Sequence, residues 1–326
     1  MKNYTVRRYA SEDFAVWNAF ISTANNATFL FHRDFMEYHK DRFEDFSLMV
    51  FDEENLVSVI PANRAGVAVY SHQGLTYGGF VFDAKIRLGA VLDIAKNVLQ
   101  FLNQNGISTF QLKLVPSIYN HYFAEAIEYA LFLTEAKLVR RDCLSVIDMT
   151  KPFSFTKTRK ESIRRGEKNH LEIKEELEFD LFWNEILIPN LDKKHSAKPV
   201  HTAAEIIRLQ QKFPKNIRHF NVYHQGKIVA GTTIFITDKV AHPQYISGNP
   251  QKNELGSLDY LYNHLITDIF KDKNFFDFGP SHEENGKKIN EGILFWKETF
   301  GAKTTVQDYY QVATENFPLL ENVLIK

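Results

Sequence analysis

The amino-acid sequence predicts an α/β protein with two domains in tandem. The chain has 326 residues, a length that suits two domains better than one. Hydrophobic residues make up 44% of it, which is ample material for a sizeable core in each domain. Both halves also show the same succession of strands, long helix, strand, helix and strand. That order is typical of α/β domains with crossover helices.

Apolar spacing places the elements of the first half. The pattern predicts a helix at residues 11–24, extended runs at 47–51 and 56–61, strand and turn at 69–80, a helix at 86–103, a strand at 108–115, a helix at 119–131 and a strand at 141–149. The long helix is the clearest of these, because its apolar residues recur at every third and fourth position. Gly106 is expected to end it.

The second half repeats the order. The pattern predicts two strands at residues 217–238 around the turn Gln225-Gly226, a strand at 240–249, a helix at 257–273, a strand at 275–281, a helix at 290–302 and a closing strand at 304–313. Lys151-Pro152 interrupts the pattern between the halves. We therefore assign residues 1–150 to an N-terminal domain and residues 151–326 to a C-terminal domain.

Composition excludes several classes of function. One cysteine, Cys143, excludes an intramolecular disulfide and a thiolate metal cluster, and the 12 histidines show no recognised metal spacing, so no metal is predicted. The net charge of −1 argues against a dedicated nucleic-acid binder, although it leaves room for a local basic patch, and no DNA partner is predicted. No apolar stretch approaches the roughly 18 residues of a membrane span. The first residues lack the apolar region of a secretory signal, so a cytoplasmic location is expected.

A basic segment at residues 157–174 separates the halves. On a helix, Lys160, Arg164 and Lys168 would stack at i, i+4 spacing, where like charges repel. One interpretation is a solvated linker helix. The other is a cradle for the phosphates of a nucleotide-linked sugar, coenzyme A or tRNA. The sequence leaves both open.

Two stretches of the second half have residues suited to a ligand. Gly256 and Ser257 begin a predicted helix directly after a strand, where free N–H groups suit an anion, although Ser257 is also an ordinary N-cap. The loop after the strand at 275–281 follows a carboxyl end of the sheet, where ligands bind in α/β proteins. The stretch from this strand into the loop, residues 275–292, has the polar residues Asp277, Ser281, His282, Glu283 and Lys287, each of which is also an ordinary exposed side chain.

The helix "NEGILFWKETFGA" raises a question about one residue. Ile293, Trp296 and Phe300 form an apolar stripe, and Gly301 suits the left-handed position that ends many helices. Packing accounts for every position except Lys297. A lysine stem can cover apolar surface while its ammonium reaches water. The alternative is that Lys297 is held where chemistry takes place.

These motifs together resemble the GNAT acyltransferase superfamily, and within it the FemAB-like branch of tandem GNAT domains. The resemblance rests on the two α/β halves, "TFLFHRDFMEYH", "TRKESIRRGEK", "FDFGPS" and "GILFWKETFGA". It implies two GNAT-like domains, each with a mixed, mostly antiparallel sheet flanked by helices. It further implies transfer of an acyl or aminoacyl group to an amine, often on a cell-envelope precursor.

The resemblance also implies site residues. Lys297 falls on the family's "FK" element with one residue inserted, and Arg159, Arg164 and Lys168 fall in its basic helix. Typical GNAT enzymes hold the coenzyme A pyrophosphate with a glycine-rich loop. Here that place is "QKNELGS", with a single glycine. Fem-like enzymes that use aminoacyl-tRNA also lack the intact loop.

From these residues we predict roles. Lys297 is expected to stabilise the oxyanion, with Glu283 or Asp277 as general base. The N–H groups of Gly256 and Ser257 would hold donor phosphate. Three residues of the preceding strand and its end would shape the acyl channel, and two in the first half would touch the acceptor. These are Tyr245, Ser247 and Asn249, and His72 and Tyr77.

The predicted function is therefore N-acyl transfer. The donor is expected to be acetyl-coenzyme A or another acyl-coenzyme A, and the acceptor a nucleotide- or lipid-linked amino sugar or a peptide. The first alternative is a ligase that takes its donor from aminoacyl-tRNA. The second is a degenerate, non-catalytic domain that binds a carbohydrate or a partner protein.

Overall fold

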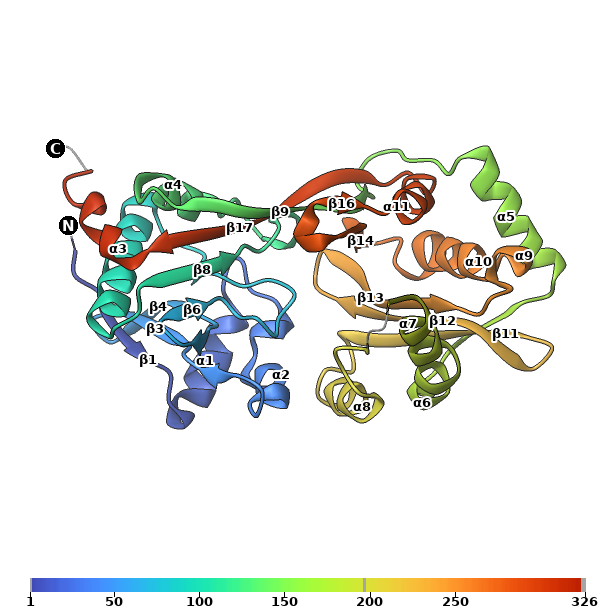
Figure 1. The fold of residues 1–326 in the computed structure, drawn as a ribbon, viewed down its shortest axis with the longest axis horizontal. Coiled ribbons are helices and arrows are strands. Elements are labelled where there is room, and N and C mark those ends of the chain that lie inside the picture. Colours follow the sequence, from blue (N-terminus) through green and yellow to red (C-terminus); the bar gives the residue numbers. More distant parts are fainter. Residues whose placement is uncertain (1, 196–197, 324–326) are drawn as a thin grey trace. The chain divides into compact units, whose positions relative to one another are not determined.

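The computed structural model describes residues 2–195 and 198–323, and it divides into two compact units (Figure 1). One consists of Met1–Asp142 with Val306–Lys326, and the other of Cys143–Thr305. Two long strands, β9 (Lys137–Asp148) and β17 (Lys303–Ala313), each have residues in both units.

The unit boundaries differ from the predicted domains. The sequence assigned all of residues 151–326 to the second domain and expected the last strand to close its sheet. Instead, the second part of β17 pairs antiparallel with β8 (Thr109–Lys113) of the N-terminal unit. Val312 and Leu320 are buried in that unit's core. The chain end therefore belongs to the first unit, because its strand pairing and its apolar side chains are used there.

The N-terminal unit has two sheets and four α-helices among its described residues. One sheet has the strand order β1-β3-β4-β7, and the other contains the succession β17-β8-β6-β5-β2, in which only β6 and β8 are parallel. Its further elements are β1 (Thr5–Arg8), α1 (Phe14–Ile21), α2 (Arg33–Met36), β2 (Glu44–Asp45), β3 (Leu48–Asp52), β4 (Asn55–Ile60), β5 (Asn63–Ala65), β6 (Ala68–Tyr70), β7 (Val81–Phe82), α3 (Leu88–Gln104) and α4 (Ala126–Leu133).

Helix α3 follows the apolar spacing of the sequence. Its buried face includes Val91, Ile94 and Val98, as the repeat at every third and fourth position predicts. Gly106 has a φ of +75°, the left-handed backbone that glycine adopts without steric cost at a helix end. Helix α4 is shorter than predicted, because residues 117–119 form a separate 3-10 turn.

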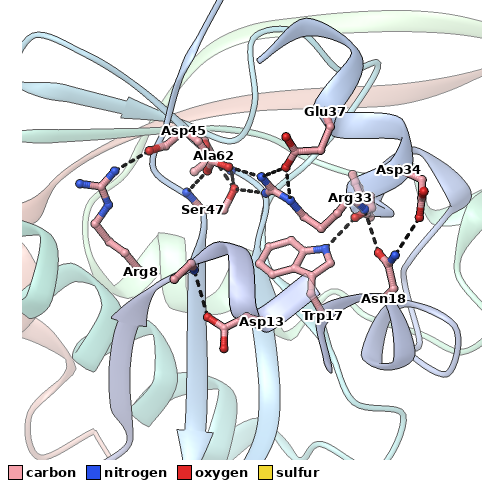
Figure 2. A network of polar contacts seen from close by, with 12 residues as sticks. Arg8, Asp13, Trp17, Asn18, Arg33, Asp34, Glu37, Asp45, Ser47 and Ala62 are labelled. Atoms are coloured by element: carbon pink, nitrogen blue, oxygen red, sulfur yellow. Dashed lines mark hydrogen bonds and ion pairs between the residues drawn. The ribbon is translucent and has the colours of Figure 1, made fainter. Parts of the chain in front are cut away.

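A buried arginine joins the helical start of this unit to its sheet (Figure 2). The Arg33 guanidinium forms ion pairs with Glu37 and Asp45, and it lies 3.8 Å from the centre of the Tyr9 ring. It also donates to Ser47 Oγ. Because the buried charge has carboxylate partners, the network fixes α2 against β2 and β3 without leaving a charge unpaired.

The C-terminal unit has one six-stranded succession, β10-β11-β12-β13-β14-β9. Every neighbouring pair is antiparallel except β13 with β14. Its elements besides β9 and β17 are α5 (Lys157–Lys168), β10 (Glu172–Glu175), α6 (Phe179–Phe182), α7 (Ile188–His195), α8 (Ala203–Lys212), β11 (Ile217–His224), β12 (Lys227–Ile236), β13 (Val240–Gly248), α9 (Lys252–Leu255), α10 (Ser257–His264), β14 (Phe275–Pro280), β15 (His282–Glu283), β16 (Lys288–Ile289) and α11 (Glu291–Glu298).

Helices cover both faces of this sheet (Figure 1). On one face, α10 packs its Leu261 and Tyr262 into the core with Phe276 of β14. The other face carries α6, α7 and α8, where Trp183 packs against Tyr245. These three helices were not expected from the sequence pattern. The α8 start has a readable signal, the capping box of Thr202 and Glu205.

The expected fold class is confirmed. Both units have mixed sheets with helices against them, and most strand pairs are antiparallel. None of the described helices is long and apolar enough to cross a membrane.

Candidate active site in the C-terminal unit

The strands β13 and β14 separate shortly after they begin. They pair in parallel only at Val240 with Phe275 and at Ala241 with Phe276. On its other side, β13 pairs with β12 through an irregular register, in which Gln244 is an extra residue between two paired positions. The first side chains beyond the last paired residues are His242 on β13 and Asp277 on β14. Asp277 was predicted from the sequence as a site residue, but His242 was not. The strand pairing that brings the two residues together is not visible in one sequence.

His242 and Asp277 contact each other at this point. The His242 Nδ1 atom lies 2.9 Å from the backbone oxygen of Asp277 and 3.2 Å from its carboxylate Oδ2. The other carboxylate oxygen accepts a hydrogen bond of 2.8 Å from Gly279 N. The Asp277 carboxylate is therefore held by the following turn of its own strand, and it fixes the imidazole ring.

Lys297 of α11 lies at the end of β14. Its ammonium donates to the backbone oxygens of Gly279, at 2.9 Å, and Pro280, at 2.6 Å. The Asn290 side chain caps the helix by accepting from Ile293 N. Because α11 begins at this cap, the lysine six residues after Glu291 turns inward to the strand.

The exposure of α11 contradicts the packing interpretation of Lys297. The lysine is 3% exposed, whereas Phe295 is 60% exposed and Ile293 also faces solvent. The stem therefore does not carry the ammonium out to water. Trp296 and Phe300 do pack into the core as predicted. The apolar stripe is narrower than the sequence indicates, and the buried position beside it holds a cation.

Burial lowers the pKa of Lys297 to about 8, and the nearby Asp277 carboxylate opposes this change. At neutral pH the ammonium therefore keeps its proton. An ammonium has three N–H donors. Two are used by backbone oxygens, and the third has no acceptor among the described residues. It is suited to a developing negative charge on a ligand.

Two buried polar atoms, one on β13 and one directly after β14, have no hydrogen-bond partner among the described residues. They are Oγ of Ser281, a side chain 6% exposed, and Oε1 of Gln244. Ser281 directly follows the carbonyl that holds Lys297, and Gln244 is the extra residue of β13. Buried polar groups normally have a partner in the functioning protein. Gln244 of β13 and Ser281, directly after β14, therefore offer groups to a ligand or to water.

The other predicted catalytic residue, Glu283, lies three residues after the end of β14. Glu283 is exposed on β15, which pairs with β16 in a small hairpin. Its carboxylate is thus in water, unlike that of Asp277.

The predicted phosphate site at Gly256 and Ser257 is not exposed. Gly256 has a φ of +71° and lies so close to the backbone of Ser162 in α5 that a Cβ atom would clash there. Ser257 is fully buried. Helices α9 and α5 pack on this turn, so the arrangement does not present it to a phosphate. The single glycine of "QKNELGS" is used for helix packing.

Each of the predicted acyl-channel residues forms a hydrogen bond with a residue of the same unit. The Tyr245 hydroxyl lies 2.6 Å from His201 Nδ1, and Ser247 Oγ accepts from Asn190. Asn249 accepts a bond from the backbone of Gln251 and so shapes the turn after β13.

The basic helix divides into two sides. Arg159 is buried, where it forms an ion pair with Asp259 of α10 and donates to Thr299 Oγ1 at 2.7 Å. Burial lowers its pKa, and Asp259 opposes that effect. Arg164 and Lys168 are exposed. The buried side therefore holds the helices together, and only the exposed side is open to a ligand.

The two predicted acceptor residues of the N-terminal unit are buried. His72 stacks on His39 with ring centres 5.0 Å apart, and burial lowers its pKa to about 3. The Tyr77 hydroxyl donates to Thr28 at 3.2 Å. Neither side chain is at the surface of its unit.

No group of side chains that could hold a metal ion occurs among the described residues. This absence does not test the prediction that the reaction uses no metal, which stays a prediction.

The sequence matches no family model and no curated protein. The fold matches several solved structures over nearly the whole chain. For FemX the TM-score is 0.67 at 10% identity, over 97% of this chain and 99% of that one. For L-PGS from Bacillus licheniformis it is 0.56 at 11% identity, over 95% and 93%. For a tandem GNAT protein from the clavulanic acid biosynthesis pathway it is 0.51 at 10% identity, over 96% and 99%.

These likenesses define the class of fold. The chain has the tandem GNAT-like fold of FemX, as the sequence motifs indicated. At such low identities the likeness carries the fold alone, and the activity has to be argued from the site.

Proposed function

We propose that this protein is an N-acyltransferase whose reaction takes place where β13 and β14 separate. The observation that carries the proposal is the buried Lys297 ammonium, which has one N–H without an acceptor among the described residues. A donor carbonyl placed against that N–H would become more electrophilic. The charge that develops on its oxygen would be stabilised by a fixed cation in a site of low dielectric constant.

In the proposed reaction, the neutral amine of the acceptor attacks the carbonyl carbon and forms a C–N bond. The carbonyl oxygen carries the negative charge of the tetrahedral intermediate, next to Lys297. The intermediate collapses, the bond from carbon to the donor's sulfur or oxygen breaks, and the amine nitrogen loses one proton. The donor leaves as a free thiol or hydroxyl.

The sequence names acyl-coenzyme A as the first donor. One feature of the fold favours the alternative, aminoacyl-tRNA. The start of α10 is buried under α5 and α9, so the turn that would hold a pyrophosphate is covered. The exposed side of α5 carries Lys160, Arg164 and Lys168, a row of cations that suits a polyphosphate backbone. As acceptor we propose an amine on an amino sugar or a peptide of cell-envelope biosynthesis.

The donors are distinguished by direct binding. Purified protein is titrated with acetyl-coenzyme A and with aminoacyl-tRNA, each at several salt concentrations. Micromolar binding of tRNA that weakens steeply with salt supports the tRNA donor, since counterions are released from the phosphates. Binding of acetyl-coenzyme A alone supports the thioester donor.

Transfer is then measured with a labelled acyl group and a panel of amino sugars and peptides. Labelled product that requires Lys297 supports the proposal. Ligand binding without product from any donor and acceptor pair would favour a non-catalytic binding domain.

A further inference from the structure

The proposed transfer requires a proton acceptor, which the predicted residues do not supply. Attack by an amine leaves an excess proton on nitrogen, and a base within hydrogen-bond reach accelerates its removal. Lys297 cannot serve, because its ammonium must keep its proton to stabilise the oxyanion. Glu283 is exposed on the β15–β16 hairpin. Asp277 is buried, and its carboxylate is already engaged by Gly279 N and by His242.

We infer that His242 is the general base of this transfer and that Asp277 is its positioning residue. The inference rests on the proposed function and adds the proton path to it. Both atoms near Nδ1, the backbone and carboxylate oxygens of Asp277, are acceptors. Nδ1 therefore carries the ring proton, and the lone pair is on Nε2. Nε2 forms no hydrogen bond with the described residues.

The position of the ring fits this role. His242 is the first residue of β13 beyond the part that pairs with β14, so its ring lies where these two strands separate. The ring also approaches Gly279: a Cβ atom on that glycine would be 3.2 Å from His242 Cε1. The Gly279 carbonyl in turn holds Lys297. The imidazole and the ammonium thus both approach the same residue, which suits a base and an oxyanion donor that act on one carbonyl.

The charged groups around the ring suit a base. On β14 the ring faces the Asp277 carboxylate, which stabilises the imidazolium that forms. The cation that α11 contributes is Lys297, which is held on backbone oxygens. On β12 the paired neighbour of His242 is the apolar Phe235. The ring is only partly buried, with 14% of the side chain exposed, so Nε2 can meet a substrate amine.

The proton then has a complete path. As the C–N bond forms, Nε2 takes one proton from the amine nitrogen, and the ring becomes imidazolium beside Asp277. When the tetrahedral intermediate collapses, the imidazolium returns a proton to the leaving sulfur or oxygen. The ring ends neutral, and no further reactant is needed.

The decisive variant is His242→Asn. The Asn amide nitrogen can replace Nδ1 as donor to the Asp277 backbone oxygen, but it cannot accept a proton at the position of Nε2. A structural role therefore predicts an unchanged rate, whereas the base role predicts a fall of about 10²- to 10⁴-fold in single-turnover rate. His264→Gln is the matched control. His264 also pairs with a carboxylate, Asp268, at 2.8 Å, but on the exposed side of α10, and we expect full activity.

A second variant covers the case in which His242→Asn folds poorly. In His242→Ala, free imidazole at millimolar concentration is expected to restore part of the rate, while Lys297→Met is not restored by it. Donor binding is measured for each variant. An unchanged rate in folded His242→Asn, or no rescue of folded His242→Ala, overturns the inference and leaves the proposed function standing. No product from the wild-type protein with any donor overturns the proposed function, and the inference with it.

Discussion

Replacing Lys297 by methionine tests the centre of the proposed site. Methionine keeps most of the length of the buried stem and removes the ammonium. The loss of one oxyanion donor typically lowers the rate by about 10²- to 10³-fold, equivalent to about 2.7–4 kcal/mol in the barrier. We expect a loss in that range in single-turnover transfer, with unchanged affinity for the donor. The ammonium acts only when charge develops on the carbonyl oxygen.

The same substitution has opposing effects on stability. Burial moves the pKa of Lys297 from 10.5 to about 8, which corresponds to about 3 kcal/mol against the charged form. Methionine removes that cost. It also leaves the backbone oxygens of Gly279 and Pro280 without their donor, at a cost of about 1–3 kcal/mol each. These contributions offset each other in part, so we expect the free energy of unfolding to change by no more than about 3 kcal/mol.

The chain offers a matched control in Lys273→Met. Lys273 also donates to two backbone oxygens, those of Thr237 and Asp238, and burial also lowers its pKa. Thr237 and Asp238 lie before the start of β13, and Lys273 lies before the start of β14, so these contacts precede the point where the two strands separate. Urea unfolding should show small changes for both variants, while only Lys297→Met should lose transfer. A folded Lys297→Met protein with wild-type turnover would refute the assignment of Lys297.

Three further outcomes are expected. The transfer rate should fall above about pH 8 as Lys297 loses its proton, and a pH–rate profile of Lys297→Arg should show this fall at higher pH. Because the pKa of Lys297 in the folded protein lies below 10.5, this residue should also make the free energy of unfolding rise with pH between about 8 and 10.5. Arg159→Met should lower the free energy of unfolding in urea by about 3 kcal/mol, since it leaves the buried carboxylate of Asp259 without its ion pair. Lys168→Met should leave stability unchanged and lower the affinity for tRNA. Gly166→Ala should cost about 1–3 kcal/mol, because its Cβ would meet the Tyr260 side chain; a thermal shift of zero would contradict this packing.

Local patterns in the sequence were sufficient for much of the fold. The long helix α3 and the strands β11 and β12 follow from the spacing of apolar residues, and from Gly106 after α3 and Gly226 in the turn between the strands, because these are properties of neighbouring residues. The same holds for α11, which ends at Glu298 and is followed by the expected left-handed glycine, Gly301. The helices α6 to α8 were missed because their apolar residues pack on a sheet face that only the folded chain defines.

The sequence alone determined two α/β units, the GNAT-like resemblance and the candidacy of Lys297. Only the tertiary structure decided which residues meet. In the structure, Lys297 is buried and bound to two backbone carbonyls, and Arg159 is buried in an ion pair with Asp259. Ser257 is buried as well, and His242 lies beside Asp277. The physical reason is that these contacts join strands and helices far apart in the chain. Their geometry depends on strand pairing and helix packing, which no single stretch of residues specifies.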